Sequence, residues 1–273
     1  VERLDDGTPL EVRITVDGAR LSFDFTGSAA VHPGNLNATP AVVRSVVLYV
    51  LRLLAGGELP LNEGLLDSVD IVLPTGMLNP EFPDDPFAAP AVVGGNVETS
   101  QRLTDLILKA LRLLACGQGT MNNTLFGNER FGYYETVCGG AGAGKGFDGA
   151  DAVHTHMPNT AITDVGVLAL RYPVRLERFE LRRGSGGAGR YRGGDGVVRE
   201  LRFLEGLSLS VLGQHRVERP YGLAGGEDGA GARVRVIRGD GREEVLEPVD
   251  GREVSPGDRL ILETPGGGGW GRE

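Results

Sequence analysis

The sequence VHTHMPNTAITDVGVLALRYPVRLERFELRRGSGGAGRYRGGDG, from Val153 to Gly196, marks the point at which the pattern of the chain changes. Before it, apolar residues recur mainly at the spacing of helices. From Arg171 onward, short alternating apolar runs are separated by glycine turns, a pattern typical of β-strands. We therefore expect an α+β fold, with a mixed portion over residues 1–160 and a β-rich, sandwich-like or barrel-like portion over residues 161–273.

The N-terminal portion contains a predicted hairpin. Residues 10–27, LEVRITVDGARLSFDFTG, alternate on both sides of Asp17-Gly18, a pair that favours a type I′ turn. A further short strand is expected in SVDIVLP, residues 68–74. The proline-rich residues 78–93 are expected to form an irregular loop, because proline fixes φ and lacks a backbone donor.

Two amphipathic helices are also expected in this portion. Thr39 is the predicted N-cap of the first, which ends at Gly56, and the second begins at Thr99 or Ser100 and continues to Gly117. The apolar faces comprise Val43, Val46, Val47, Val50, Leu51 and Leu54 in the first helix and Leu103, Leu106, Ile107, Ala110, Leu111 and Leu114 in the second.

The acidic composition limits the class of partner. The formal net charge is -9, whereas binding to a phosphate backbone or an anionic membrane requires a basic face. No apolar run of about 18 residues and no signal segment is present, so we expect a cytoplasmic protein without a membrane span. Because Val1 is not a methionine and lies within a strand-like run, we expect the C-terminal part of a larger subunit.

Glycine is unusually frequent, with 44 residues in 273, against a usual share of about 7%. The glycines lie between apolar runs and form no repeat, which indicates tight turns and close approaches of backbone segments. Cys116 and Cys138 lack the spacing of a zinc site or a disulfide framework, and we expect both to be small buried residues.

A pair of histidines is the first candidate for chemistry. On an extended strand, His154 and His156 would place both imidazoles on one face, where they could hold a divalent metal or transfer a proton. Asp164 is the nearest carboxylate that could complete such a site, with Asp148 and Asp151 as further candidates. The alternative is a hydrogen-bonded structural pair beside a turn.

The glycine-rich loop SGGAGRYRGGDG, residues 185–196, is the second candidate. Its unobstructed backbone N–H groups, with Arg190 and Arg192, suit a carboxylate or phosphate. A glycine-rich turn whose arginines pair with Asp195 or Glu200 would produce the same sequence. The loop lacks the GK[ST] of a Walker A motif and is followed by a strand-like run, so we do not expect this chain to bind ATP.

Several motifs in order resemble the hydantoinase B/oxoprolinase family. Besides residues 153–196 they are NEG at 62–64, GGNVETSQRLTD at 94–105, CGGAGAG at 138–144, RPYGLAGGEDG at 219–229 and TPGGGGWG at 264–271. The resemblance implies a subunit of an ATP-dependent amidohydrolase that opens cyclic amides of the hydantoin or 5-oxoproline type. It also implies that an A-type ATPase partner, and not this chain, binds the ATP.

For the reaction, the resemblance makes His154, His156 and Asp164 candidates for base or metal contacts. Arg190 and Arg192 are candidates for donors to the oxyanion that forms when a small-molecule lactam is attacked. Two other interpretations of the same resemblance stay open: an acetone-carboxylase-like subunit, and a non-catalytic assembly module of such a complex.

One departure from the family pattern affects this choice. After Asn159-Thr160, which we expect to hold backbone through side-chain hydrogen bonds, the family usually reads close to TDVEVLE, whereas this chain reads TDVGVLA. Gly166 and Ala169 therefore stand where glutamates are expected. If those carboxylates contact a metal, a proton or a partner, this chain lacks that function.

Overall fold

The computed structural model describes residues 1–56, 60, 62–158 and 160–272 of the chain. The chain divides into two compact units, Val1–Leu113 and Leu114–Glu273, which are described separately below. None of the helices built from the described residues combines the length and apolarity that a membrane crossing requires.

The first unit contains two small sheets. Strands β1 (Glu2–Arg3) and β2 (Pro9–Leu10) form an antiparallel pair. Strands β3 (Arg13–Asp17), β4 (Arg20–Asp24) and β5 (Val69–Val72) form a three-stranded sheet in that order. The strand expected in residues 68–74 is thus confirmed as β5, which pairs with β4 in parallel.

The predicted hairpin is confirmed, but its turn lies one residue further along the chain. Asp17 pairs with Arg20, so the two turn residues are Gly18 and Ala19. Of these two described residues, only Gly18 has a positive φ, of 57°. A positive φ at the first turn residue alone is the pattern of a type II′ turn and not of the expected type I′ turn.

Helix α1 (Pro40–Ala55) has the predicted bounds. Pro40 occupies its first turn, and Gly56, with φ 65°, ends it. The side chain of Thr39, however, makes no capping hydrogen bond. Most of the predicted apolar face is buried, although Leu54 is 48% exposed. The fully buried residues of this face are Val43, Val46, Val47 and Val50.

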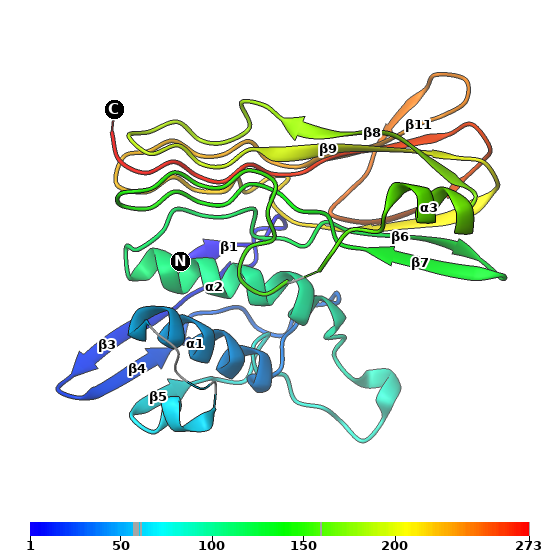
Figure 1. The fold of residues 1–273 in the computed structure, drawn as a ribbon. Coiled ribbons are helices and arrows are strands. Elements are labelled where there is room, and N and C mark those ends of the chain that lie inside the picture. Colours follow the sequence, from blue (N-terminus) through cyan, green and yellow to red (C-terminus); the bar gives the residue numbers. More distant parts are fainter. Residues whose placement is uncertain (57–59, 61, 159, 273) are drawn as a thin grey trace. The chain divides into compact units, whose positions relative to one another are not determined.

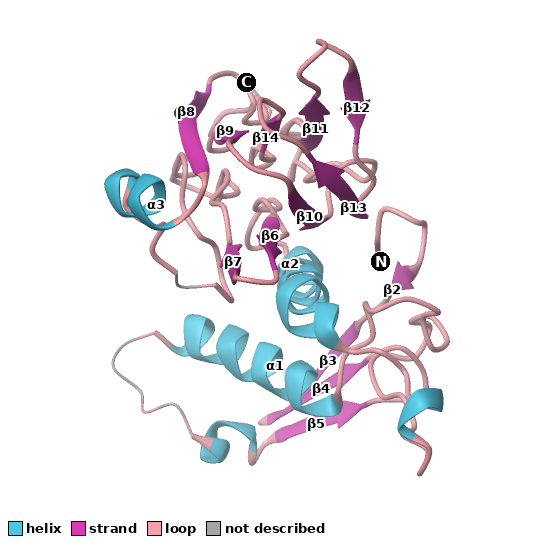
Figure 2. Cartoon of the chain, turned by 90° about the vertical axis from the view of Figure 1, so that its right-hand side faces the viewer, coloured by secondary structure: helices cyan, strands magenta, loops and turns pink. Residues whose placement is uncertain are grey.

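Helix α2 (Ser100–Ala110) ends earlier than expected. A π-helical turn, η3 (Gly95–Thr99), leads into it, and it packs against α1 (Figure 2). The apolar spacing continues to Leu114, but Arg112 has φ 54°, in the left-handed region that ends a helix. The prediction of a helix up to Gly117 was therefore wrong.

The irregular stretches of the first unit also agree with expectation. Residues 78–92 contain one short 3-10 turn, η2 (Pro86–Ala88), and otherwise no helix or strand. The NEG motif forms the start of a second 3-10 turn, η1 (Glu63–Leu66), where the Asn62 side chain accepts a hydrogen bond from the Gly64 N–H at 3.0 Å.

The second unit is a β-sandwich with glycine-rich segments that extend from the ends of its strands (Figure 1). One antiparallel sheet has the order β13-β10-β6-β7 and comprises β6 (Asn123–Asn128), β7 (Phe131–Glu135), β10 (Leu207–Leu212) and β13 (Val249–Val254). The other has the order β12-β11-β14-β9-β8 and comprises β8 (Val174–Arg182), β9 (Gly196–Phe203), β11 (Arg233–Ile237), β12 (Glu243–Val245) and β14 (Arg259–Glu263). The expected α+β fold with a β-rich C-terminal portion is confirmed. Strands β6 and β7 precede residue 160, and β6 pairs with β10, which follows it. The domain boundary that we expected at residue 160 stays a prediction.

The core of the sandwich draws apolar side chains from both sheets. Phe126 of β6 stacks on Tyr133 of β7, with ring centroids 4.6 Å apart, and meets Phe203 of β9 edge-on at 5.9 Å. Leu201 of β9 and Leu209 of β10 are each 1% exposed. Burial of side chains of this size contributes about 1.5–3 kcal/mol each, which holds the two sheets together.

Beyond the sheets, six glycine-rich segments run side by side without forming strands; we call them the glycine bundle (Figure 1). They comprise residues 115–118, 139–144, 148–153, 185–195, 220–231 and 264–271. Backbone N–H groups of each segment donate to carbonyl groups of the others. Gly268, for example, donates to Cys116 at 2.8 Å, and Gly140 donates to Pro265 at 2.9 Å.

The segment at residues 266–270 changes its acceptor segment with a period of three. Gly266 and Gly269 donate to residues 220–231, and Gly267 and Trp270 donate to residues 185–195. Gly268 donates to Cys116, whereas Gly271, with φ 73°, leaves the pattern and donates to Leu223. Three residues per turn, with no hydrogen bonds inside the segment, is the geometry of polyproline II. As in collagen, glycine is required because neighbouring backbones leave no room for a Cβ atom. The close backbone approaches expected from the glycine content are confirmed.

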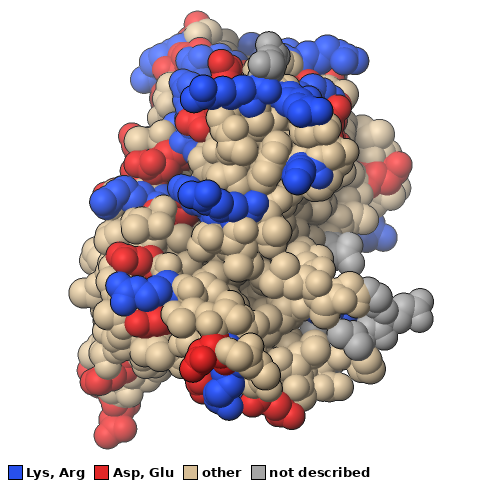
Figure 3. Space-filling model, turned by 90° about the vertical axis from the view of Figure 1, so that its left-hand side faces the viewer, with Lys and Arg blue, Asp and Glu red and all other residues tan. Residues whose placement is uncertain are grey.

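Charged side chains of both signs share the surface. On the face shown in Figure 3, the Lys and Arg side chains that the structure describes lie among Asp and Glu side chains. The pair Arg20–Asp70, 2.8 Å apart with side chains 59% and 55% exposed, is representative. Pairs this exposed contribute little to stability, because water screens them.

Candidate functional site

A cavity of about 420 Å³ in the second unit contains one of the predicted histidines. It is lined by Cys138, Ala152, His154, Thr160, Ile162, Phe179, Glu180, Leu181 and Val197. Leu181 of β8 and Val197 of β9 are paired across the sheet, so two adjacent strands form the apolar wall. A mostly apolar pocket with a few polar groups is the usual form of a small-molecule site.

His154 is the titratable base of this cavity. Its Nε2 lies 3.3 Å from the hydroxyl oxygen of Thr160, which also contacts the hydroxyl of Thr136. Among the described residues, its buried Nδ1 has no hydrogen-bond partner. Burial lowers the pKa of His154 below 6.5, because it penalises the imidazolium form. At neutral pH the ring is therefore uncharged and able to accept a proton.

The other members of the predicted histidine cluster lie elsewhere or have other partners. Only Val153 makes a β-bridge in this segment, and His156 has φ 62°, so the residues do not form the extended strand that we expected. Asp164 caps helix α3 (Val165–Arg171) by accepting hydrogen bonds from two backbone N–H groups, at 2.9 and 3.1 Å. Within the described chain, neither histidine belongs to a group of three metal-ligating side chains. Asn159 lies outside the described residues.

Neighbouring aspartates hold one of the two arginines of the glycine loop. The guanidinium of Arg192 lies 3.0 Å from Asp151, and its backbone N–H donates to Asp148 at 2.8 Å. Arg190 is exposed, and its backbone N–H donates to Gly271. Asp195 accepts from the backbone N–H groups of Gly184, directly before the loop, and of Gly186 within it. Within the loop, the N–H groups of Gly187, Gly193 and Gly194 donate to backbone carbonyls, so these three are not offered to an anion.

A buried ion pair lies beside the cavity. Arg199 of β9 donates to both carboxylate oxygens of Glu135 on β7, at 2.8 and 3.0 Å, and the two side chains are 3% and 4% exposed. The guanidinium also lies 5.2 Å from the ring centroid of Phe179, which lines the cavity. Burial raises the pKa of the Cys138 thiol, while Arg199 opposes this shift. The thiol facing the cavity is therefore protonated at neutral pH.

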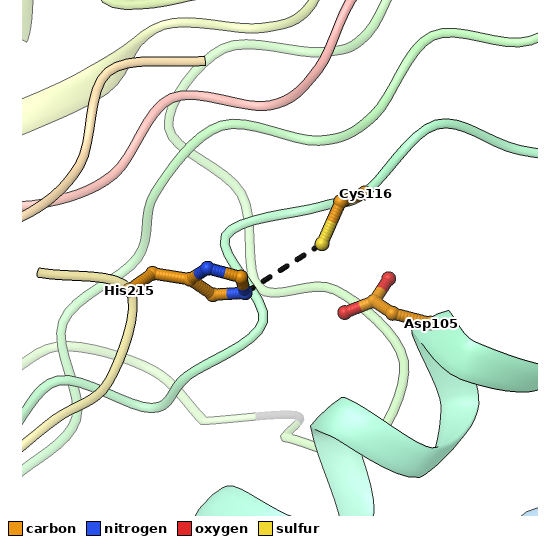
Figure 4. Close-up of side chains that lie close together, drawn as sticks. All are labelled: Asp105, Cys116 and His215. Carbon is orange, nitrogen blue, oxygen red and sulfur yellow. Dashed lines mark hydrogen bonds between the residues drawn. The ribbon is translucent and has the colours of Figure 1, made fainter. Parts of the chain in front are cut away.

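Sequence reasoning missed one close pair of reactive groups. The Sγ of Cys116 lies 3.6 Å from Nε2 of His215, and both residues are completely buried (Figure 4). Nδ1 of His215 contacts the carbonyl oxygen of Glu218, an arrangement that leaves Nε2 to accept the thiol proton. The two residues are 99 positions apart, so no local motif could reveal the pair. Asp105, also labelled in Figure 4, belongs to the first unit.

Comparison with known proteins identifies the family. The model of the hydantoinase B/oxoprolinase family matches residues 1–273, the whole chain. The chain belongs to the hydantoinase B/oxoprolinase family. It is 44% identical over 273 residues to a 5-oxoprolinase of Dictyostelium discoideum, covering 99% of this chain and 21% of that relative. The chain thus spans about a fifth of the length of this hydantoinase B/oxoprolinase relative.

Solved structures support the same family fold. The ATP-dependent caprolactamase from Pseudomonas jessenii has a TM-score of 0.79 and 25% identity, covering 97% of this chain and 49% of that chain. The nucleotide-free structure of acetone carboxylase has a TM-score of 0.78 and 19% identity, covering 97% of this chain and 42% of that chain. The second likeness concerns the fold alone.

The departures from the hydantoinase B/oxoprolinase pattern lie on helix α3. Gly166 and Ala169 are both exposed, and the N–H of Gly166 donates to the capping carboxylate of Asp164. Neither residue lines the cavity that contains His154. Glycine and alanine in place of the two glutamates therefore alter the exposed surface of helix α3 and leave the wall of this cavity unaltered.

The lowered pKa of His154 predicts an acid-dependent loss of stability. As the pH falls through 6.5, the unfolded chain binds a proton at this residue that the folded chain does not, so the folded state loses stability until the folded pKa is reached. The loss is at most about 1.4 kcal/mol per pH unit. Thermal melts at several pH values between 7.5 and 5 should show a smaller acid dependence for His154→Gln than for the wild type. An equal dependence in both proteins would contradict this assignment, and His156→Gln serves as the matched histidine control.

Proposed function

We propose that this chain forms part of the B-type portion of an ATP-dependent enzyme that opens cyclic amides of the 5-oxoproline or hydantoin type. The observation that carries the proposal is the family match over the whole chain, together with 44% identity to a 5-oxoprolinase. The likeness to an ATP-dependent caprolactamase supports lactams as the substrate class. A cavity of about 420 Å³ suits a small ring.

ATP is proposed to bind to an A-type ATPase partner or domain and not to this chain. The glycine loop supports this division, because its N–H groups at Gly187, Gly193 and Gly194 are already donated to backbone carbonyls. A phosphate cradle requires such groups to point at the ligand. When bound, ATP supplies the phosphoryl group that activates the unreactive amide.

His154 is the proposed general base of this chain. Its neutral imidazole lies in the wall of an apolar cavity, where it can take a proton from an attacking water while Thr160 orients the ring. Arg190 and Arg192 remain proposed donors to the developing oxyanion, through their guanidinium groups. His156 and Asp164 remain proposed contacts for a proton or a divalent metal in the complete enzyme, although among the described residues neither belongs to a group of three metal-ligating side chains.

A second candidate is an acetone-carboxylase-like reaction, which the shared fold favours. In the hydrolase, the product is a ring-opened amino acid, whereas a carboxylase forms a new carbon–carbon bond between bicarbonate-derived carbon and a ketone. Incubation of the full protein and its ATPase partner with ATP and either 5-oxoproline or acetone plus bicarbonate distinguishes the two by product. A non-catalytic assembly role predicts that neither product depends on the side chains of this chain.

Substitution of His154 tests the proposed role directly. In the full protein with its ATPase partner, His154→Gln should lower the rate of ATP-dependent ring opening about 10²-fold or more, because a general base contributes on that scale. Its melting temperature should stay within a few degrees of the wild type. Unchanged turnover in a correctly folded variant would remove His154 from the mechanism. A fall in activity that only tracks unfolding would show a structural role instead.

A further inference from the structure

A second cavity, of about 430 Å³, lies at the end of the five-stranded sheet where β8 finishes and β11 begins. Its lining includes Arg182, Arg216, Arg219 and Arg233, and among the described residues that line it Glu247 is the single carboxylate. We call it the arginine cavity. In a chain whose net charge is -9, four guanidinium groups around one hollow require an explanation.

Two glutamates near the cavity are each shared between two arginines. Arg233 lies 2.7 Å from Glu243, and the guanidinium of Arg182 lies 3.8 Å from Glu263. Both glutamates also pair with Arg235, at 3.4 and 3.1 Å. Glu243 and Glu263 are therefore each divided between two guanidinium groups, and neither is reserved for the arginine that lines the cavity.

Two of the arginines are fixed in place by backbone carbonyls. Arg182 donates to Gly231 and Thr264 at 2.7 and 3.0 Å, and Arg216 donates to Leu246 at 2.7 Å. Burial lowers the pKa of Arg182, and the positive charges of neighbouring arginines add to this, while Glu263 opposes it. The cavity thus contains prepositioned guanidinium groups.

Arg219 completes the wall with an exposed side chain that, among the described residues, makes no ion pair. It begins the RPYGLAGGEDG motif, whose next residue, Pro220, accepts a hydrogen bond from Gly229 at 2.8 Å within the glycine bundle. The bundle therefore fixes the backbone beside Arg219 while its guanidinium stays available at the cavity.

We propose that the arginine cavity binds a phosphate group, either free or carried by a small molecule. Guanidinium groups match phosphate oxygens through paired N–H donors, and a phosphate group carries a charge of about -1.5 to -2 at neutral pH, which more than one guanidinium group is needed to balance. The site is separate from the cavity of His154, because the two share no lining residue. It does not depend on the proposed cyclic-amide activity.

Titration calorimetry of the full protein with inorganic phosphate at low ionic strength tests this site. Arg219→Gln and Arg233→Gln should each weaken one saturable binding event about tenfold or more, since each removes a charge-assisted donor. Arg175→Gln removes an exposed arginine of β8 that does not line the cavity, and it should leave the affinity unchanged within about twofold. Melting temperatures of all variants show whether they fold.

A parallel titration with ADP identifies the source of the phosphate. Tighter binding of ADP that is lost in the same two variants would assign the site to a nucleotide, whereas a weaker response to ADP would assign it to free phosphate. Absence of saturable phosphate or ADP binding would overturn the proposal. Equal affinities in the cavity variants and in Arg175→Gln would overturn it as well. No turnover is measured in either titration, so the outcome is independent of the proposed enzymatic activity.

Discussion

Replacing Gly267 by alanine is expected to lower the melting temperature by about 10 °C or more. A Cβ atom at this position would overlap the carbonyl group of Ala141 and lie 2.8 Å from the backbone nitrogen of Gly142. The neighbouring segments would have to separate, which disturbs the hydrogen bonds that Gly267 makes with Gly194 and Gly187, at 2.9 and 2.8 Å. Overpacking of about 1–3 kcal/mol and about 1 kcal/mol for each lost hydrogen bond together give this shift.

Gly132→Ala is the matched control for this experiment. Gly132 lies on β7, and a Cβ atom there would meet no other atom within 4 Å. Alanine in a strand is equal to or slightly better than glycine, so its melting temperature should stay within about 3 °C of the wild type. Scanning calorimetry of both variants provides the comparison. If Gly267→Ala has the same melting temperature as Gly132→Ala, the glycine bundle tolerates side chains and the packing argument is wrong.

Breaking the Arg199–Glu135 pair should have an effect of similar size. Arg199→Met leaves a carboxylate that is 4% exposed without its partner, and loss of one member of a buried pair costs about 3–5 kcal/mol of unfolding free energy. The pair also joins β9 in one sheet to β7 in the other, and Tyr133 donates to the same carboxylate at 2.8 Å. Burial, more than this carboxylate, raises the pKa of Tyr133 to about 12.

A double-mutant cycle separates the free energy of the Arg199–Glu135 interaction from the cost of lost packing around each substituted side chain. Glu135→Met with Arg199→Met removes both charges, so the double variant should be more stable than either single variant. Arg20→Met breaks the exposed pair with Asp70 and should cost far less than Arg199→Met, because water screens this pair. Chemical denaturation of the four variants gives the free energies. A cost for Arg199→Met as small as that for Arg20→Met would show that the buried pair is not coupled to folding.

The parts of the fold that sequence could predict are those with local signals. Alternation around Asp17-Gly18 predicted the hairpin, but not that pairing of Asp17 with Arg20 would move the turn by one residue. Apolar spacing predicted both helices, yet it continued past the true end of α2, because a positive φ at Arg112 leaves no trace in the pattern of apolar residues.

The candidate site was predictable only in part for the same reason. His154 was selected from its neighbour His156, although the cavity around it is built from β8 and β9 and from coil residues. Asp164 directly precedes an apolar helical run, and this N-cap signal was available in the sequence. The contact of Cys116 with His215, across 99 positions, depends on tertiary structure that spacing cannot express.

The three-residue period of the glycine bundle has a consequence for how this chain can change in length. The donors of residues 266–270 face their neighbouring segments in rotation, so adding or deleting one residue would turn every later donor by a third of a turn, toward a different segment. Insertions within the segment therefore keep its pairing only in multiples of three. Length variation should instead accumulate in the connections outside the bundle, where a shift by one residue breaks none of the hydrogen bonds between its segments.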